Sequence, residues 1–335
     1  MDSIKVVQVG LGPLGQKIVQ YISERKGIKI IGAVELDPMK VGKDLGDLCS
    51  VDKQLDVKVT DDIGEVLKIC KPDVAILSTV SSIKKLLPQL EDMAKLGINV
   101  VSTCEELSYP WKTEPEIAER INQTAKKHGV AVLGTGVNPG FLMDFFPIAL
   151  TAVCQRVDSI KISRIQDATY RRIPFQKKIG AGLTLDEFER RKREGSLRHV
   201  GLTESMYMIA ERMGWKVDSI EDIISPVIAE KEVMMGRTIV LPGMTLGVQQ
   251  MGRAYGEGKE RITLEFRASV GEPGPADTIQ IRGLPDIVSS IPGGINGDVA
   301  TCAIIINAMR SILEASPGLK TMTDIPVVSY FSAWR

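Results

Sequence analysis

A short glycine-rich turn near the N-terminus constrains the fold of this chain more than any other feature. A β-branched stretch at residues 4–9 runs directly into Gly10, Gly12 and Gly15, and apolar residues at helical spacing follow from Ile18. Gly10 permits a tight turn, Gly12 lets a pyrophosphate approach the backbone, and Gly15 lets the helix pack closely on the strand. The pattern predicts a strand, turn and helix that bind a dinucleotide. The residues expected to contact it there are Gly10, Gly12, Pro13, Leu14 and Gly15.

An acidic residue after the second strand supports this interpretation. Residues 28–34 form another β-branched stretch that ends in Glu35, about 20 residues past the glycines, where a carboxylate can accept hydrogen bonds from an adenosine ribose. Asp37 is a second candidate for this role. A carboxylate at this place repels a 2′-phosphate and favours NAD, although Lys40 and Lys43 follow closely and could accommodate NADP. We therefore expect NAD as the cofactor, with NADP as the alternative.

The charge balance and the cysteines argue against several classes of protein. Lys plus Arg and Asp plus Glu each number 42, so the chain lacks the positive charge typical of a protein that binds nucleic acid or an anionic membrane. Its five cysteines are scattered without a CxxC pair, which is typical of reduced thiols and predicts no metal site. No apolar run approaches the roughly 18 residues of a membrane span, and no signal peptide is expected. We expect a soluble cytoplasmic protein with a small-molecule partner.

Alternating strands and helices predict a dinucleotide-binding domain at residues 1–145. Apolar strands are expected at 73–77, 98–102 and 130–133, with a helix that ends at Gly97 and another at 114–128; Pro88 makes the first turns of the former uncertain. Five or six parallel strands with crossover helices form a doubly wound sheet, and its ligands bind at the carboxyl ends of the strands. The residues expected at that edge are Ser78, Thr79, Thr103, Cys104, Glu105, Gly136 and Asn138. Among them, Ser78, Thr79, Cys104 and Asn138 are predicted to contact the cofactor.

A change of pattern predicts a second, α+β domain at residues 146–295. The segments 159–165 and 261–267 alternate apolar and polar residues, which is typical of antiparallel strands with one open face. Helices are expected at 185–193 and 202–213. The last part, 296–335, contains an apolar helix from Val299 to Ala315 that must be buried on most sides and is expected to return to the first domain.

Two adjacent carboxylates follow the strand at 98–102, where a nicotinamide ring would reach. Glu105 and Glu106 cannot both face a cleft if the strand geometry persists, because successive side chains point to opposite sides. Glu105 is the first candidate for a catalytic acid/base and Glu106 the alternate. Either one could instead be an acid that merely begins a helix.

Candidate substrate-binding residues lie mainly in the second domain. The segment 167–178 is rich in cations that suit a carboxylate, and Arg171 or Arg172 could bind one bidentately, although a solvated basic loop is an equal alternative. His199 lies in a loop before a helix, where either a site role or a structural role is open. The glycine-rich segment 293–301 could approach a ligand or form only a crossing between domains. The predicted substrate-binding residues are Asn138, Asp167, Tyr170, Arg171, Arg172, Gln176, His199 and Thr301.

These segments together resemble a known enzyme family. The motifs GLGPLG, NVVSTCEELSYPW, DATYRRIPFQKKIGAG and GDVATCAIIINAMRSILEASPGL are similar to those of 2,4-diaminopentanoate dehydrogenases and related native amine dehydrogenases, and the resemblance covers nearly the whole chain. It implies the fold of dihydrodipicolinate reductase, with an N-terminal Rossmann domain, an α+β substrate and dimerisation domain, and a returning C-terminal helix. The histidine pair and lysine motif of that reductase are absent.

The resemblance also implies an activity. The expected reaction is the reversible, NAD(P)-dependent oxidative deamination of 2,4-diaminopentanoate to 2-amino-4-oxopentanoate and ammonia, in ornithine breakdown, by a homodimer. The essential glutamate of the amine dehydrogenases maps onto the pair Glu105 and Glu106. Alternatives are an amine dehydrogenase for simple ketones, an imine reductase like dihydrodipicolinate reductase, and a dinucleotide-binding regulator without chemistry.

Overall fold

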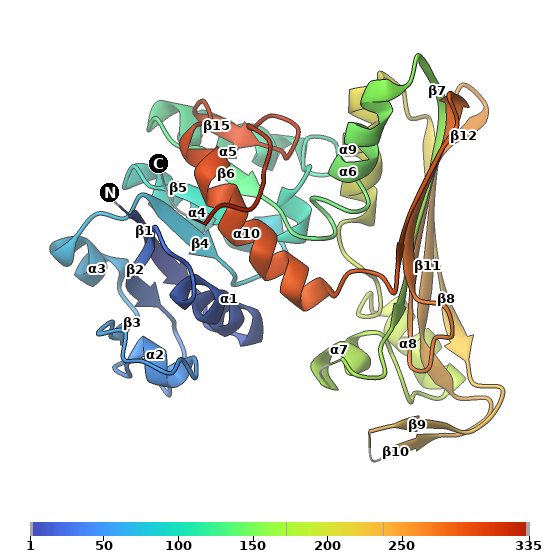
Figure 1. Ribbon diagram of the computed structural model, residues 1–335, viewed down its shortest axis with the longest axis horizontal. Helices are drawn as coiled ribbons and strands as arrows, with labels where there is room; N and C mark the ends of the chain where they lie inside the picture. The colour runs from blue at the N-terminus through green and yellow to red at the C-terminus, as the bar shows by residue number, and fades with distance from the viewer. Residues whose placement is uncertain (1–2, 172, 237, 333–335) are drawn as a thin grey trace. The chain divides into compact units, whose positions relative to one another are not determined.

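The chain folds into two units. A computed structural model describes residues 3–171, 173–236 and 238–332. The first unit comprises Met1–Phe141 and Asn296–Arg335, and the second comprises Leu142–Ile295 (Figure 1). The C-terminal segment therefore joins the same unit as the N-terminal strand and glycine turn.

A seven-stranded parallel sheet forms the centre of the first unit, which confirms the predicted doubly wound fold. Its strand order is β15-β6-β5-β4-β1-β2-β3. The strands are β1 (Ile4–Val9), β2 (Ile28–Val34), β3 (Val59–Thr60), β4 (Val74–Leu77), β5 (Asn99–Ser102), β6 (Ala131–Gly134) and β15 (Gly318–Lys320). The sequence did not predict β3 and β15, because two or three residues are too few to show an apolar pattern.

Helices cover both faces of this sheet. The helices α3 (Ile63–Ile69), α4 (Ile83–Lys95) and α5 (Pro115–Lys127) share one apolar core with the strands. Pro88, which left the first turns of this helix uncertain in the sequence, does not interrupt α4. The helix begins at Ile83 and runs through the proline. Gly97 and Gly129, with φ of +68° and +69°, follow α4 and α5 as predicted. The short helix α2 (Leu45–Leu48) follows β2.

The apolar C-terminal helix α10 (Gly297–Leu313) packs against α1 (Pro13–Ser23) and against strands of the sheet (Figure 1). It begins two residues before the predicted start, because the Asn296 side chain accepts hydrogen bonds from the backbone N–H groups of Asp298 and Val299, both at 3.1 Å. Across the described ranges, no helix combines the length and apolarity that a membrane span requires.

A six-stranded mixed sheet organises the second unit, in the order β14-β13-β7-β12-β11-β8, beside a separate β9–β10 hairpin. The strands are β7 (Arg156–Asp167), β8 (Ser219–Ile228), β9 (Val233–Met235), β10 (Thr238–Val240), β11 (Thr245–Gly256), β12 (Lys259–Ser269), β13 (Ala276–Leu284) and β14 (Ile287–Pro292). The helices are α6 (Phe145–Leu150), α7 (Ile173–Lys178), α8 (Leu185–Arg193) and α9 (Leu202–Met213), and a 3₁₀ turn η2 (Thr151–Val153) follows α6.

One expectation about this sheet is wrong in part. The two strands predicted from their alternating pattern, β7 and β12, are neighbours that run parallel, whereas the other pairs are antiparallel. Alternation reports that one face is buried, and it carries no information about the direction of the neighbouring strand. Helices α8 and α9 have the predicted bounds.

Candidate active site

The carboxyl ends of the central strands form one continuous edge in the first unit. A backbone hydrogen bond of 2.9–3.0 Å links the end of each strand to the next along this edge. The donor and acceptor residues are Gly10 with Val34, Ser78 with Val9, Thr103 with Leu77, and Thr135 with Ser102. Neighbouring strands lie about 4.8 Å apart, so the edge spans about 14 Å from the end of β2 to the end of β5. The edge therefore separates the acid predicted to bind a ribose from the acid predicted to be catalytic.

The glycine turn has the backbone geometry that a pyrophosphate requires. Gly10 has a φ of +87°, which side chains rarely allow, and a Cβ on Gly15 would lie 2.1 Å from the Gly10 carbonyl oxygen. A Cβ on Gly12 would meet no atom within 4 Å, so the backbone there faces open space. Pro13 starts helix α1, whose N-terminal N–H groups suit phosphate oxygens.

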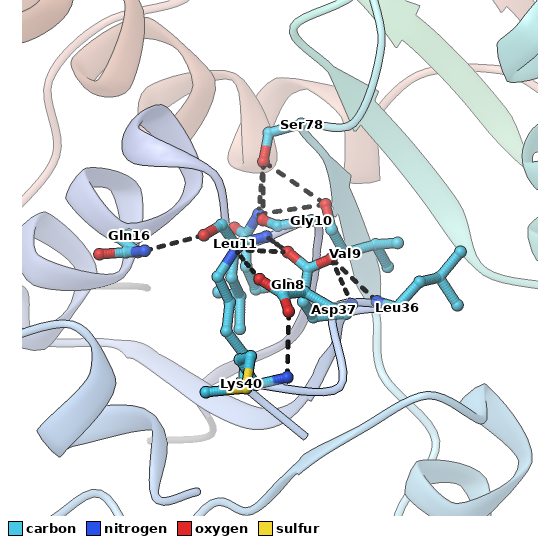
Figure 2. A network of polar contacts seen from close by, with 11 residues as sticks. Gln8, Val9, Gly10, Leu11, Gln16, Leu36, Asp37, Lys40 and Ser78 are labelled. Atoms are coloured by element: carbon cyan, nitrogen blue, oxygen red, sulfur yellow. Dashed lines mark hydrogen bonds and ion pairs between the residues drawn. The ribbon is translucent and has the colours of Figure 1, made fainter. Parts of the chain in front are cut away.

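Two side chains that were not predicted to support the turn hold it through hydrogen bonds, as Figure 2 shows. The fully buried Gln8 amide donates to the Gly10 carbonyl at 2.9 Å and to the Ser78 hydroxyl at 2.8 Å. The Ser78 hydroxyl donates to the same carbonyl at 3.0 Å. Ser78, predicted to contact the cofactor, therefore also supports the turn, while Gln8 was missed altogether. The sequence feature that could have identified Gln8 is an amide side chain in an otherwise apolar strand.

Glu35 holds the turn from the opposite side. Its carboxylate accepts the Leu11 N–H at 2.8 Å, which ties the end of β2 to the glycine turn. Burial alone would raise the pKa of Glu35, but hydrogen bonds from backbone N–H groups and the nearby Lys40 outweigh it and lower that pKa. The carboxylate is therefore ionised at neutral pH, as recognition of a ribose hydroxyl requires. Asp37, the alternate acid, turns one oxygen to the Met39 N–H at 3.0 Å.

The two adjacent glutamates after β5 differ in what they contact. They begin the 3₁₀ turn η1 (Glu105–Leu107), as the alternative of an acid at a helix start anticipated. The Glu106 carboxylate accepts the Ile83 N–H at 2.8 Å and so caps the first turn of α4. The Glu105 carboxylate accepts no hydrogen bond from any residue that the structure describes, while its backbone carbonyl is fixed by the Ser108 hydroxyl at 2.8 Å. Glu106 has a structural partner, whereas the Glu105 carboxylate has none among the described residues.

Removing the carboxyl of Glu106 tests whether this side chain stabilises the start of α4. In Glu106→Ala the Ile83 N–H loses its acceptor, so we expect the free energy of unfolding to fall by about 1 kcal/mol. Urea unfolding of the two proteins measures this change. An unaltered midpoint would show that the cap contributes nothing to stability.

Cys104 directly precedes the two glutamates, and its side chain is buried. Its side chain is 1% exposed, and its thiol contacts the Ser81 carbonyl oxygen at 3.1 Å. Burial raises the pKa of the thiol to about 12, and the neighbouring glutamates add to this effect. The thiol is therefore protonated at neutral pH and is not a nucleophile. A contact between Cys104 and the cofactor stays a prediction. Because the side chain is buried, such a contact would involve mainly the backbone of Cys104.

The remaining predicted residues of this edge lie after β4 and β6. Thr79 is exposed, and its hydroxyl donates to Gln89 at 3.0 Å. Thr301 on α10 accepts the Val137 N–H at 3.3 Å, which brings α10 against the loop after β6. Asn138 in that loop is buried and precedes a cis proline. Thr301 and Asn138 thus belong to one local structure, which the sequence had placed in separate segments.

In the second unit, the predicted cation Arg171 contacts two neighbouring side chains. Its guanidinium donates to the Gln166 amide oxygen at 3.3 Å and lies 4.0 Å from the centre of the Phe175 ring. Gln166 is buried and was not predicted. Arg172, the alternative cation, lies outside the described residues.

The other predicted substrate residues of this unit contact the protein itself. Asp167 accepts the Thr169 N–H at 2.9 Å and the Gly271 N–H at 3.1 Å, so it supports a turn. Gln176 donates to the Ala168 carbonyl at 2.8 Å. The His199 ring stacks on Phe266 with centroids 4.4 Å apart. Tyr170 is 95% exposed and free of such packing. These geometries favour structural roles for Asp167 and Gln176.

A buried ion pair lies close to Gln166. Arg164, 2% exposed, donates to Asp277 at 3.3 Å and to the Ile295 carbonyl at 2.9 Å, and Gln166 donates to the same carbonyl at 3.1 Å. Burial lowers the pKa of the guanidinium to about 10, so it stays charged at neutral pH. The pair fixes the last residue of this unit before the chain enters α10.

Breaking this pair is expected to be costly. Arg164→Met leaves the Asp277 carboxylate buried without its counter-ion, so we expect a loss of about 3–5 kcal/mol in the free energy of unfolding. Adding Asp277→Leu removes the unpaired buried carboxylate and should restore part of the lost free energy of unfolding. Urea unfolding of both variants checks this; a double variant less stable than the single one would contradict the account.

Comparisons with known proteins show the family to which the chain is similar. The model for the 2,4-diaminopentanoate dehydrogenase C-terminal domain matches residues 141–333, and the model for the N-terminus of dihydrodipicolinate reductase matches residues 4–132. The chain is 33% identical over 340 residues to 2,4-diaminopentanoate dehydrogenase of Acetoanaerobium sticklandii, covering 98% of this chain and 94% of that protein. It is 23% identical over 349 residues to an amine dehydrogenase of Streptomyces virginiae, covering 97% and 96%.

A solved structure extends the likeness to the fold. The amine dehydrogenase from Mycobacterium smegmatis matches with a TM-score of 0.85 at 27% identity, over 99% of this chain and 98% of that one. The matches confirm the predicted fold, the NAD(P) cofactor and the oxidoreductase class that acts on a CH–NH₂ group. With one family model covering more than half of the chain and a relative matching nearly all of it, the chain belongs to the 2,4-diaminopentanoate dehydrogenase family.

Proposed function

We propose that this protein oxidises 2,4-diaminopentanoate at C4 with NAD⁺ and water, giving 2-amino-4-oxopentanoate, ammonium, NADH and a proton, and that it also catalyses the reverse reaction. The observation that supports this most is the pair of glutamates after β5. One of them, Glu106, caps α4, while Glu105 presents a carboxylate without a partner among the described residues. The name of the relative from Acetoanaerobium sticklandii supports the choice of substrate.

Glu105 is the general acid/base of the proposed reaction. The bound nicotinamide supplies the hydride acceptor. An ammonium cannot release a hydride from its carbon until the nitrogen lone pair is available, so Glu105 takes a proton from the ammonium. Loss of the hydride then leaves an iminium, and Glu105 passes the proton that it holds to solvent. The ionised carboxylate next takes a proton from the water that adds to the iminium carbon, and it returns a proton to the leaving ammonia. Its backbone, fixed through Ser108, holds the carboxylate in place for these transfers.

Arg171 is the proposed partner of the substrate carboxylate. A guanidinium binds a carboxylate bidentately, and contacts with Gln166 and Phe175 restrict its rotamers before the substrate arrives. We assign substrate binding and dimerisation to the second unit. The homodimer, the cytoplasmic location and the place in ornithine breakdown stay predictions drawn from the family resemblance and the cysteine pattern.

A panel of amines with NAD⁺ tests the proposed substrate. We expect 2,4-diaminopentanoate to give the highest kcat/KM, and its analogue without the carboxylate to lose at least about tenfold, because Arg171 then has no anion to bind. Faster turnover of simple amines would favour the alternative of an amine dehydrogenase for simple ketones. Absence of NADH formation with every amine would contradict the proposal.

A further inference from the structure

The Glu35 carboxylate has all its acceptor positions occupied. One oxygen accepts the Leu36 N–H at 2.8 Å and the Asp37 N–H at 3.2 Å, and the other accepts the Leu11 N–H at 2.8 Å and the Lys40 ammonium at 3.5 Å. A carboxylate offers about four lone-pair positions. A ribose hydroxyl that donates to Glu35 must therefore displace one of these four donors.

The four donors are not equally easy to displace. Three are backbone N–H groups, two of them on the residues that follow Glu35 and one on Leu11 in the glycine turn. The fourth, Lys40, is the most distant, and its long side chain has a second anchor, Asp37, at 3.3 Å. Lys40 can leave Glu35 without losing its counter-ion, whereas a displaced backbone N–H would be left without an acceptor.

The bond to Leu11 gives Glu35 a second task. Leu11 is fully buried, so its N–H depends on this carboxylate for a partner. Gln8 and Ser78 hold the Gly10 carbonyl next to it (Figure 2). The peptide group that joins Gly10 to Leu11 in the glycine turn is thus held at both its carbonyl and its N–H. Because NAD and NADP share the same pyrophosphate, loosening the turn weakens the binding of both.

We propose that Glu35 is a positioning residue for the glycine turn and that Lys40 is the residue that sets the preference between NAD and NADP. The adenosine ribose displaces Lys40 from Glu35. With NAD the ammonium stays on Asp37, and with NADP it turns to the 2′-phosphate. The proposal rests on the dinucleotide cofactor alone, so the identity of the amine substrate does not affect it.

Fluorescence titration with NADH and NADPH tests the role of Glu35. We expect Glu35→Gln to raise the Kd of both cofactors by about tenfold or more, since an amide cannot accept from both sides of this site. Asp37→Asn is the comparison variant, because it removes a charge beside the same lysine but keeps the Leu11 bond; the 2′-phosphate then faces no rival anion for Lys40, so its Kd for NADPH should not rise. Tighter NADPH binding in Glu35→Gln would overturn the positioning role.

The exchange of Lys40 tests the second half of the proposal. We expect Lys40→Met to raise the Kd for NADPH by about tenfold and to lower that for NADH by about twofold, because the ribose no longer competes with the ammonium. Lys43→Met, the same change on an exposed lysine three residues away, should leave the ratio of the two constants unaltered. Weaker NADH binding in Lys40→Met, or equal shifts of the ratio in the two variants, would contradict the proposal. These variants decide the matter even if Glu35→Gln does not fold.

Discussion

Glu105→Gln is expected to lower turnover of the amine by about 10²-fold or more, while the Kd for NADH changes by less than about twofold. The amide has the size of the carboxylate but cannot take a proton from the substrate ammonium. No described residue depends on the Glu105 carboxylate for a hydrogen bond, so the fold should be unaffected. Steady-state kcat with 2,4-diaminopentanoate, the NADH titration and a thermal unfolding curve measure the three quantities.

Glu106→Gln is the matched control for this variant. Its amide oxygen can still accept the Ile83 N–H, so the cap of α4 persists and turnover should fall by less than about tenfold. The opposite pattern, an inactive Glu106→Gln beside an active Glu105→Gln, would move the acid/base role by one residue. Equal, small effects in both would show that neither carboxylate moves protons.

Gly15→Ala is expected to abolish measurable cofactor binding and to destabilise the protein by about 1–3 kcal/mol. The new Cβ would lie 2.1 Å from the Gly10 carbonyl oxygen and 2.8 Å from the Ser78 hydroxyl, so helix α1 must move away from the turn. That movement withdraws the helix N-terminus from the pyrophosphate. NADH titration and urea unfolding report the two effects.

Gly12→Ala separates the ligand from the fold. A Cβ at this position meets nothing within 4 Å, so stability should be retained. We expect the Kd for NADH to rise by about tenfold or more, because the methyl group occupies the space that the pyrophosphate needs. Unaltered NADH affinity in Gly12→Ala would mean that the pyrophosphate binds elsewhere.

Local patterns sufficed for much of the first unit. Strands β1 and β2 follow from β-branched runs, and the turn between β1 and α1 follows from three glycines with distinct steric tasks. The short strands β3 and β15 were missed because their pairing depends on neighbours already in place. The parallel arrangement of β7 and β12 was missed because strand direction is set by the connections between them.

The roles of the site residues depended more on tertiary contacts. The sequence identified Glu105 and Glu106 together, and only the Ile83 N–H, 23 residues away, distinguishes them. Gln8 and Gln166 could have been found, since each is a polar residue at a buried position of a strand pattern. Asp167 was included with the cation-rich segment 167–178, but the turn that it supports involves Gly271, 104 residues later in the chain.

The most direct test of the proposed reaction is the ratio of ammonia released to NADH formed with 2,4-diaminopentanoate and NAD⁺. We expect equimolar amounts from the unmodified protein, with both products falling together by about 10²-fold in Glu105→Gln. NADH without ammonia would indicate oxidation at another group, and ammonia without NADH would indicate an elimination. Either result would contradict the proposal that this protein is an amine dehydrogenase with Glu105 as its acid/base.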